Sequence, residues 1–167
     1  MGKTAIVFGS TTGNTESVAE MIAEKLGGDA SILNVDDMSS SDFESYDNLI
    51  LGTSTWGSGD LQDDWEGSID DLESADLNGK VIALFGLGDA ESYSDTFVDG
   101  MGKVYEAVKD KGCTLVGAVD TDGYDYEESE AVVDGKFVGL PLDQDNADDE
   151  TEDRVTNWVE SFKSLLK

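Results

Sequence analysis

The stretch GSTTGNT, residues 9–15, decides the fold that this sequence predicts. It follows the apolar run AIVF, residues 5–8, which is typical of a buried strand. Residues 14–26 come next, and their apolar side chains recur at helical spacing: Val18, Met21, Ile22 and Leu26. The chain therefore begins with a strand, a hydroxyl-rich turn and a helix.

A turn of this kind suits a phosphate group, because it gathers unpaired backbone N–H groups at the positive end of a helix. Its glycines let the backbone approach a ligand closely. A capped helix start needs one polar side chain, whereas five of the six positions 10–15 carry one. The candidate phosphate-binding residues are Ser10, Thr11, Thr12, Gly13, Asn14 and Thr15.

Two common nucleotide-binding loops are excluded at this turn. A P-loop requires a lysine after its second glycine, and residues 9–15 contain none. A dinucleotide fingerprint requires Gly-x-Gly-x-x-Gly, and the glycines at 9 and 13 have the wrong spacing.

Composition limits the other function classes. The chain has 167 residues and a formal net charge of −28, which argues against binding to nucleic acid or anionic membranes and favours a basic partner surface. A halophilic or generally acidic host is another source of this charge. With no histidine, a zinc site or a Ser-His-Asp triad is effectively excluded, and a single cysteine, Cys113, excludes an internal disulfide. We find no signal peptide or transmembrane-length segment and expect a cytoplasmic protein.

Strand and helix patterns alternate along the chain, which predicts an α/β class with a doubly wound parallel sheet. Expected strands cover residues 4–8, 30–35, 48–53, 80–86 and 114–119, and expected helices cover residues 14–26, 63–72, 95–111 and 151–166. Between residues 120 and 136 the pattern is interrupted by a polar segment. Its run DTDGYD, residues 120–125, lacks the glycine position of a calcium loop, so calcium is not favoured.

Ligands of such sheets bind beyond the carboxyl ends of the strands. We therefore expect the site in three loops, residues 9–15, 54–61 and 87–93. Trp56 and Tyr93 lie on two of these loops, and each could pack against the protein or stack on a flat ligand. Beside a phosphate loop, the two together favour a flavin ring held between them.

Several motifs resemble those of the flavodoxin family. Residues 10–15 are similar to its phosphate loop, residues 55–61 (TWGSGDL) to its tryptophan loop, and residues 86–89 (GLGD) with Tyr93 to its tyrosine loop. Residues 121–124 and 135–146 resemble the insertion that marks long-chain flavodoxins. The resemblance covers essentially the whole chain.

The resemblance implies one domain, residues 1–167, with a five-stranded sheet in the order 2-1-3-4-5 whose fifth strand is split by the insertion. It also implies non-covalently bound FMN and one-electron transfer without a substrate of the protein's own. Phosphate would lie on residues 10–15, Trp56 and Tyr93 would cover the two faces of the ring, and Asp145 would contact the ribityl chain. The expected ring-edge residues are Ser54, Thr55, Gly57, Ser58, Gly59, Leu87, Gly88 and Asp89.

Two alternatives share this scaffold. An FMN-dependent NAD(P)H:quinone reductase would need an open ring face and a positively charged nicotinamide surface, whereas the loops here are acidic. A phosphorylation-switched signalling domain would need aspartates at the end of the first strand, where Phe8 and Gly9 stand. We therefore expect a monomeric low-potential electron carrier. Ferredoxin-NADP-type reductases, photosystem I and nitrogenase reductase are the partners that the resemblance implies.

Overall fold

The computed structural model describes residues 3–9, 13–27, 30–56, 60, 61, 63–88, 96–121, 124, 126–143 and 150–166. In this part of the chain, no helix has both the length and the apolar composition needed to cross a membrane.

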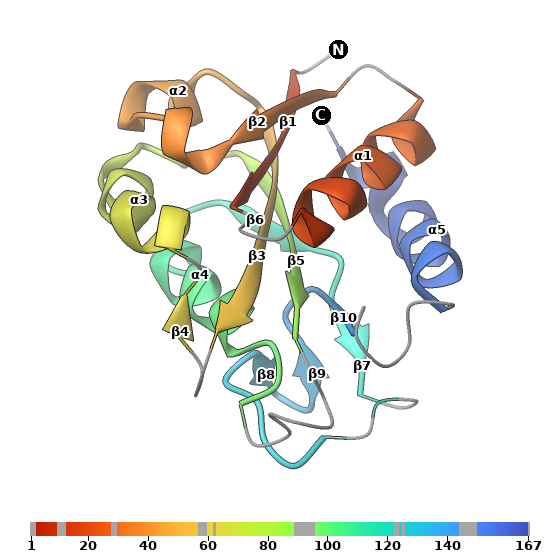
Figure 1. The fold of residues 1–167 in the computed structure, drawn as a ribbon. Coiled ribbons are helices and arrows are strands. Elements are labelled where there is room, and N and C mark those ends of the chain that lie inside the picture. Colours follow the sequence, from red (N-terminus) through yellow and green to blue (C-terminus); the bar gives the residue numbers. More distant parts are fainter. Residues whose placement is uncertain are drawn as a thin grey trace.

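A parallel sheet forms the centre of the molecule (Figure 1). Its strands lie in the order β2-β1-β3-β5, and the edge of β5 away from β3 is shared by β6 and β10. The bounds are β1 Thr4–Gly9, β2 Ser31–Asn34, β3 Asn48–Trp56, β5 Val81–Leu87, β6 Thr114–Val116 and β10 Leu140–Leu142. Taking β6 and β10 as one interrupted strand, this arrangement is the predicted order 2-1-3-4-5.

The fifth strand is split, as predicted. β6 pairs with Val81–Ala83 at the start of β5, and β10 pairs with Phe85–Leu87 at its end. Between them the insertion forms a small antiparallel sheet of three short strands: β7 (Val119–Asp120), β8 (Val132–Val133) and β9 (Lys136–Phe137). The chain returns at Gly139, where a Cβ atom would lie 2.0 Å from the Leu84 carbonyl oxygen. Only glycine lets the returning backbone lie this close to β5.

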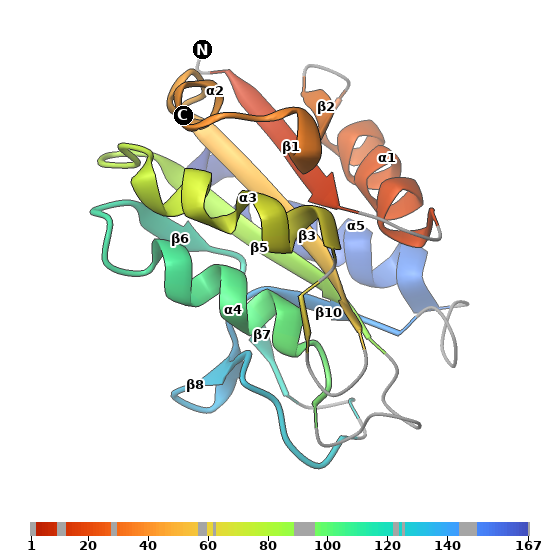
Figure 2. The ribbon, with the colours of Figure 1, turned by 60° about the vertical axis from the view of Figure 1, so that its left-hand side comes forward.

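Helices cover both faces of the central sheet (Figures 1 and 2). α1 (Asn14–Leu26) and α5 (Thr151–Phe162) lie on one face, and α3 (Asp63–Ser74) and α4 (Asp99–Val108) lie on the other. The short α2 (Ser40–Glu44) and 3-10 turns at Val35–Asp37 and Lys163–Leu165 are further helical segments of the described residues. The helical spacing read for residues 14–26 is confirmed: Val18 and Ile22 are fully buried.

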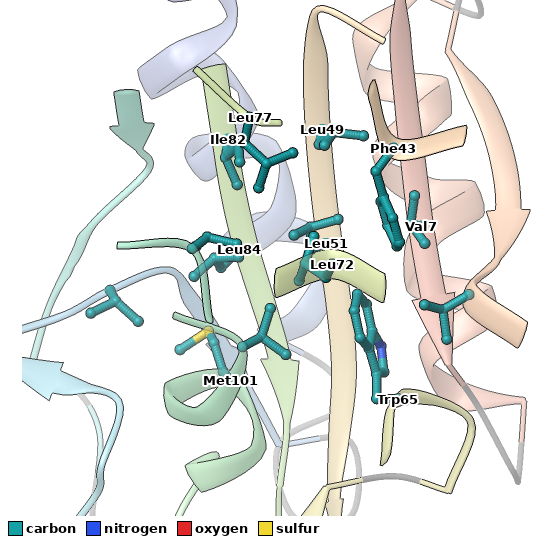
Figure 3. Close-up of a cluster of buried hydrophobic side chains, with 14 of the residues drawn as sticks. Val7, Phe43, Leu49, Leu51, Trp65, Leu72, Leu77, Ile82, Leu84 and Met101 are labelled. Carbon is teal, nitrogen blue, oxygen red and sulfur yellow. The ribbon is translucent and has the colours of Figure 1, made fainter. Parts of the chain in front are cut away.

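The core beneath α2, α3 and α4 includes Trp65 (Figure 3). Trp65 is completely buried, and its indole N–H donates to the Gly52 carbonyl at 2.6 Å, which satisfies its one polar atom. On the other face of the sheet Phe85 packs edge-on against Trp158, which packs in turn against Phe162. Replacing a buried tryptophan by alanine typically costs about 3–5 kcal/mol, so each aromatic group anchors its layer.

Several element boundaries differ from the sequence prediction; the fifth strand, expected over residues 114–119, is shortened to β6 at its first half. β3 was expected to end at residue 53, but it continues to Trp56 because its last residues pair antiparallel with β4, Asp60–Leu61. α4 begins at Asp99 and not at residue 95, and Val98 before it has a φ of 49°. Cys113 lies just before β6, half-buried, with its thiol donating to the Val108 carbonyl.

Candidate functional site

The N-terminus of α1 lies at the carboxyl edge of the sheet, near the end of β1 (Figure 1). Gly13 is the N-cap residue with a φ of 91°, and its carbonyl accepts from both the Ser17 N–H and the Ser17 hydroxyl at 3.0 Å. A Cβ atom on Gly13 would meet nothing within 4 Å. The N–H groups of the first turn have no acceptor inside the helix and are suited to an anion.

No basic side chain comes from the sequence around this turn. The chain has no Lys or Arg between Lys3 and Lys25, and none between Lys25 and Lys80. A phosphate here would therefore be held by N–H dipoles and neutral donors. Of the described residues in this turn, Asn14 is exposed and Thr15 is buried at 1% exposure.

The carboxyl end of β3 carries three consecutive hydroxyl residues whose roles differ. Thr53 is buried and its hydroxyl donates to the Ser54 carbonyl at 3.0 Å. The Thr55 hydroxyl oxygen accepts from the Gly100 N–H at 2.8 Å, across 45 residues of sequence. The Ser54 hydroxyl is buried and has no hydrogen-bond partner in the described part of the chain. A buried hydroxyl without a partner costs free energy, and a polar ligand at this strand end would relieve that cost.

The end of β5 lies beside the end of β3, because the two strands pair in register from Asn48–Val81 to Ser54–Leu87. Leu87 is buried, and the Gly88 N–H donates to the Leu142 carbonyl at 3.0 Å. A Cβ atom on Gly88 would lie 3.0 Å from the Val98 backbone nitrogen. Gly88 is therefore held between β10 and the residues that lead into α4.

Residues 96–100, which we name the α4 entry turn, pack against the ends of β3 and β5. A Cβ atom on Gly100 would lie 2.9 Å from the Ser54 carbonyl oxygen, so the helix starts directly against β3. Asp99 is 5% exposed and accepts from the Glu130 N–H at 2.8 Å. Burial raises the pKa of its carboxyl group, and that N–H bond opposes the rise.

The structure thus brings together part of the predicted site. Gly13, Asn14 and Thr15 lie at the start of α1, Ser54, Thr55 and Trp56 lie at the end of β3, and Leu87 and Gly88 lie at the end of β5. The remaining predicted residues lie outside the described part of the chain: Ser10, Thr11, Thr12, Gly57, Ser58, Gly59, Asp89, Tyr93 and Asp145. One correction applies: residues 54–56 were expected in a loop but belong to the β3–β4 hairpin.

The residues that hold the site in place through tertiary contacts could not be identified from the sequence. Asp99, Gly100 and Ser129 were read as parts of a helix and a polar insertion. Their role depends on contacts 31 to 45 residues apart in the chain. No local pattern announces such contacts. Within the described residues there is no cluster of acidic, Cys or His side chains suited to a metal ion.

Residues 6–158 match the model of the flavodoxin family. The flavodoxin of Synechocystis sp. is 46% identical to this chain over 170 residues, covering 100% of the chain and 99% of the relative. The flavodoxin of Helicobacter pylori is 46% identical over 163 residues and covers 98% of both.

Solved structures agree with the sequence comparisons. A crystal structure of Fusobacterium nucleatum flavodoxin bound to flavin mononucleotide has a TM-score of 0.95 and 33% identity, covering 100% of both chains. Oxidised flavodoxin 2 from Bacillus cereus has a TM-score of 0.75 and 28% identity, covering 98% of this chain and 99% of its own.

Proposed function

This chain belongs to the flavodoxin family, and from that premise we propose that it binds FMN non-covalently and carries single electrons at low potential between redox partners. The observation that carries the proposal is the likeness over the full length to a flavodoxin bound to FMN. FMN supplies the redox chemistry, and the protein supplies binding and electrostatics. A quinone reductase is not favoured, because the curated relatives are flavodoxins, which are electron carriers and not enzymes.

The described residues fit this cofactor. The α1 N-terminus offers N–H groups to a phosphate, with residues 10–15 as the proposed donors. The unpartnered Ser54 hydroxyl and the ends of β3 and β5 would face the polar parts of the ring and ribityl chain. Trp56 and Tyr93 are the proposed ring covers, and Asp145 is the proposed ribityl contact.

The charge of the protein favours a basic partner. With 38 acidic and 10 basic side chains, the surface repels anions and attracts cationic protein faces. We propose as partners a ferredoxin-NADP-type reductase, photosystem I or nitrogenase reductase, and a monomeric carrier of one domain. We also propose that this exchange takes place in the cytoplasm. Association with such a partner should slow as salt is added, because screening weakens electrostatic attraction.

Flavin binding and stepwise reduction of the purified chain test this proposal. We expect FMN to bind more tightly than riboflavin, and two separate one-electron steps to appear during potentiometric reduction. NADPH consumption with a quinone by this protein alone would support the reductase instead. Failure to bind FMN would overturn both.

A further inference from the structure

The insertion that splits the fifth strand contacts the α4 entry turn (residues 96–100) through residues 128–131, which we name the brace. The Phe97 N–H donates to the Glu128 carbonyl at 3.3 Å, and the Ser129 hydroxyl donates to the Phe97 carbonyl at 2.5 Å. The Glu130 N–H donates to the Asp99 carboxylate at 2.8 Å. Three consecutive brace residues thus hold the entry turn by its backbone and by one side chain.

The first turn of α4 lies directly on the brace. A Cβ atom on Gly102 would lie 2.7 Å from the Glu130 carbonyl carbon, which is closer than any side chain allows. Lys103 forms an ion pair with the Glu130 carboxylate at 3.2 Å, and the Val138 N–H donates to the Ala131 carbonyl at 2.8 Å. The brace is therefore fixed both to α4 and to the rest of the insertion.

On its other side the entry turn contacts two residues of the proposed flavin site. The Gly100 N–H of the turn donates to the Thr55 hydroxyl oxygen at 2.8 Å, and the Val98 backbone lies against Gly88. Val98 is fully buried with a φ of 49°, a conformation that costs free energy for a β-branched residue. Such a conformation persists only where the surroundings impose it, and here Phe97 and Asp99, on either side of Val98, are bonded to the brace.

We propose that the brace positions the ring edge of the flavin site. It does so by holding the α4 entry turn against Thr55 and Gly88, so Ser129 and Asp99 are positioning residues that need not touch the cofactor. This inference rests on the proposed function. In this proposal the insertion serves to preorganise the flavin-binding site.

The test uses the full-length chain with Ser129→Ala, which removes the brace hydroxyl at a distance from the ring. We expect the dissociation constants of FMN and riboflavin to rise by the same factor, about tenfold, because the hydroxyl loses its bond to the Phe97 carbonyl and the bond it accepts from the Ala131 N–H. Equal factors indicate a ring-side effect, since riboflavin lacks the phosphate. The potential for the first electron should fall by about 30 mV, which corresponds to a threefold change in relative affinity.

Ser161→Ala is the matched control. It deletes the same atom and the counterpart of the Ser129–Phe97 bond, from a hydroxyl to a backbone carbonyl at 2.5 Å, in α5. Both dissociation constants and the potential should keep their wild-type values. In a double-mutant cycle Ser129→Ala and Thr55→Val should be strongly non-additive for riboflavin binding, whereas Ser161→Ala and Thr55→Val should add.

Wild-type affinities and potential in Ser129→Ala, with additive effects in the cycle, would overturn the proposal. If Ser129→Ala fails to fold, riboflavin binding by Thr55→Val and Thr55→Ser provides the test. Serine keeps the acceptor for the Gly100 N–H and should bind riboflavin like the wild type, whereas valine should bind it more weakly. Equal losses of riboflavin affinity in the two variants would contradict the proposal. A wild-type chain that binds neither flavin would overturn the proposed function as well. A chain that binds FMN without regard to Ser129 would overturn the brace alone.

Discussion

The two halves of the candidate site are built in different ways. The phosphate half is a local structure, one strand, one turn and one helix, and one of its glycines, Gly13, has open space around the position of a Cβ atom. The ring half joins the ends of β3 and β5 to the α4 entry turn and the brace. There Gly88 and Gly100 are enclosed by neighbouring backbone and side chains.

This difference separates two uses of glycine and two routes to a binding site. In the phosphate half glycine supplies a positive φ, so the strain of a substitution would be confined to one residue. In the ring half glycine supplies room, so a substitution would displace distant segments. We therefore expect changes in the ring half to affect both stability and flavin binding, and changes in the phosphate half to act mainly on the phosphate.

The largest effect is expected from Gly100→Ala. The new Cβ atom would lie 2.9 Å from the Ser54 carbonyl oxygen and 3.0 Å from the Thr55 hydroxyl, so α4 or β3 must move. Overpacking of this kind costs about 2–3 kcal/mol of unfolding free energy, measurable by urea denaturation of the FMN-free protein. Riboflavin binding should weaken too, because the Gly100–Thr55 hydrogen bond is strained.

Gly67→Ala provides the control for Gly100→Ala. Gly67 is also helical, in α3, but a Cβ atom there would meet nothing within 4 Å. Alanine should raise the unfolding free energy by about 0.5–1 kcal/mol through its helix propensity. If both substitutions had the same sign, crowding at the α4 entry turn would not distinguish the ring half.

Thr12→Val tests the phosphate half by binding alone. The sequence predicts that Thr12 donates to the phosphate, and a lost hydrogen bond to a charged group costs about 1.5–3 kcal/mol. The dissociation constant of FMN should therefore rise by about tenfold to a hundredfold. Titration with riboflavin is the comparison, because that ligand has no phosphate and should lose little. Equal weakening of the two ligands would place Thr12 away from the phosphate and remove the contrast with the ring half.

The sequence predicted the local half of the site better than the assembled half. The bounds of α1, Asn14–Leu26, follow from its apolar spacing and from the glycines at 13 and 27, all signals within one segment. The extension of β3 to Trp56 depends on pairing with β4, and two residues of β4 carry too weak a pattern to be read. The support of Thr55 by Gly100, and of Asp99 by Glu130, depends on tertiary packing that no spacing rule records.

Gly13→Ala should have a moderate effect on stability. Space is open at this position, so the cost is only that of placing a Cβ atom at a φ of 91°, about 1 kcal/mol. Gly13→Asn should recover part of the loss, because asparagine tolerates the left-handed region better. Urea unfolding of the two variants measures this difference. A Gly13→Ala variant as stable as the wild type would show that the turn relaxes to another conformation.

The smallest effect, and the one with a defined pH dependence, concerns Asp99→Asn. Burial is the main cause that raises the pKa of Asp99, and the neighbouring Glu130 carboxylate adds to it, whereas Lys103 and the Glu130 N–H oppose it. A carboxyl group whose pKa is higher in the folded state destabilises the fold once it is ionised, so its contribution is lost as pH rises through the folded pKa.

Asparagine keeps an oxygen acceptor for the Glu130 N–H and removes the charge. We therefore expect Asp99→Asn to raise the unfolding free energy at pH 7.5 by about 0.5 kcal/mol, the size of one partly screened charge contact. The gain should shrink as pH is lowered through the raised pKa of Asp99. Asp110→Asn, at an exposed position, corrects for the general relief of negative charge. A variant less stable than wild type at every pH would show that the Asp99 carboxylate stabilises the entry turn through its charge, and that the ring half depends on an ionised group.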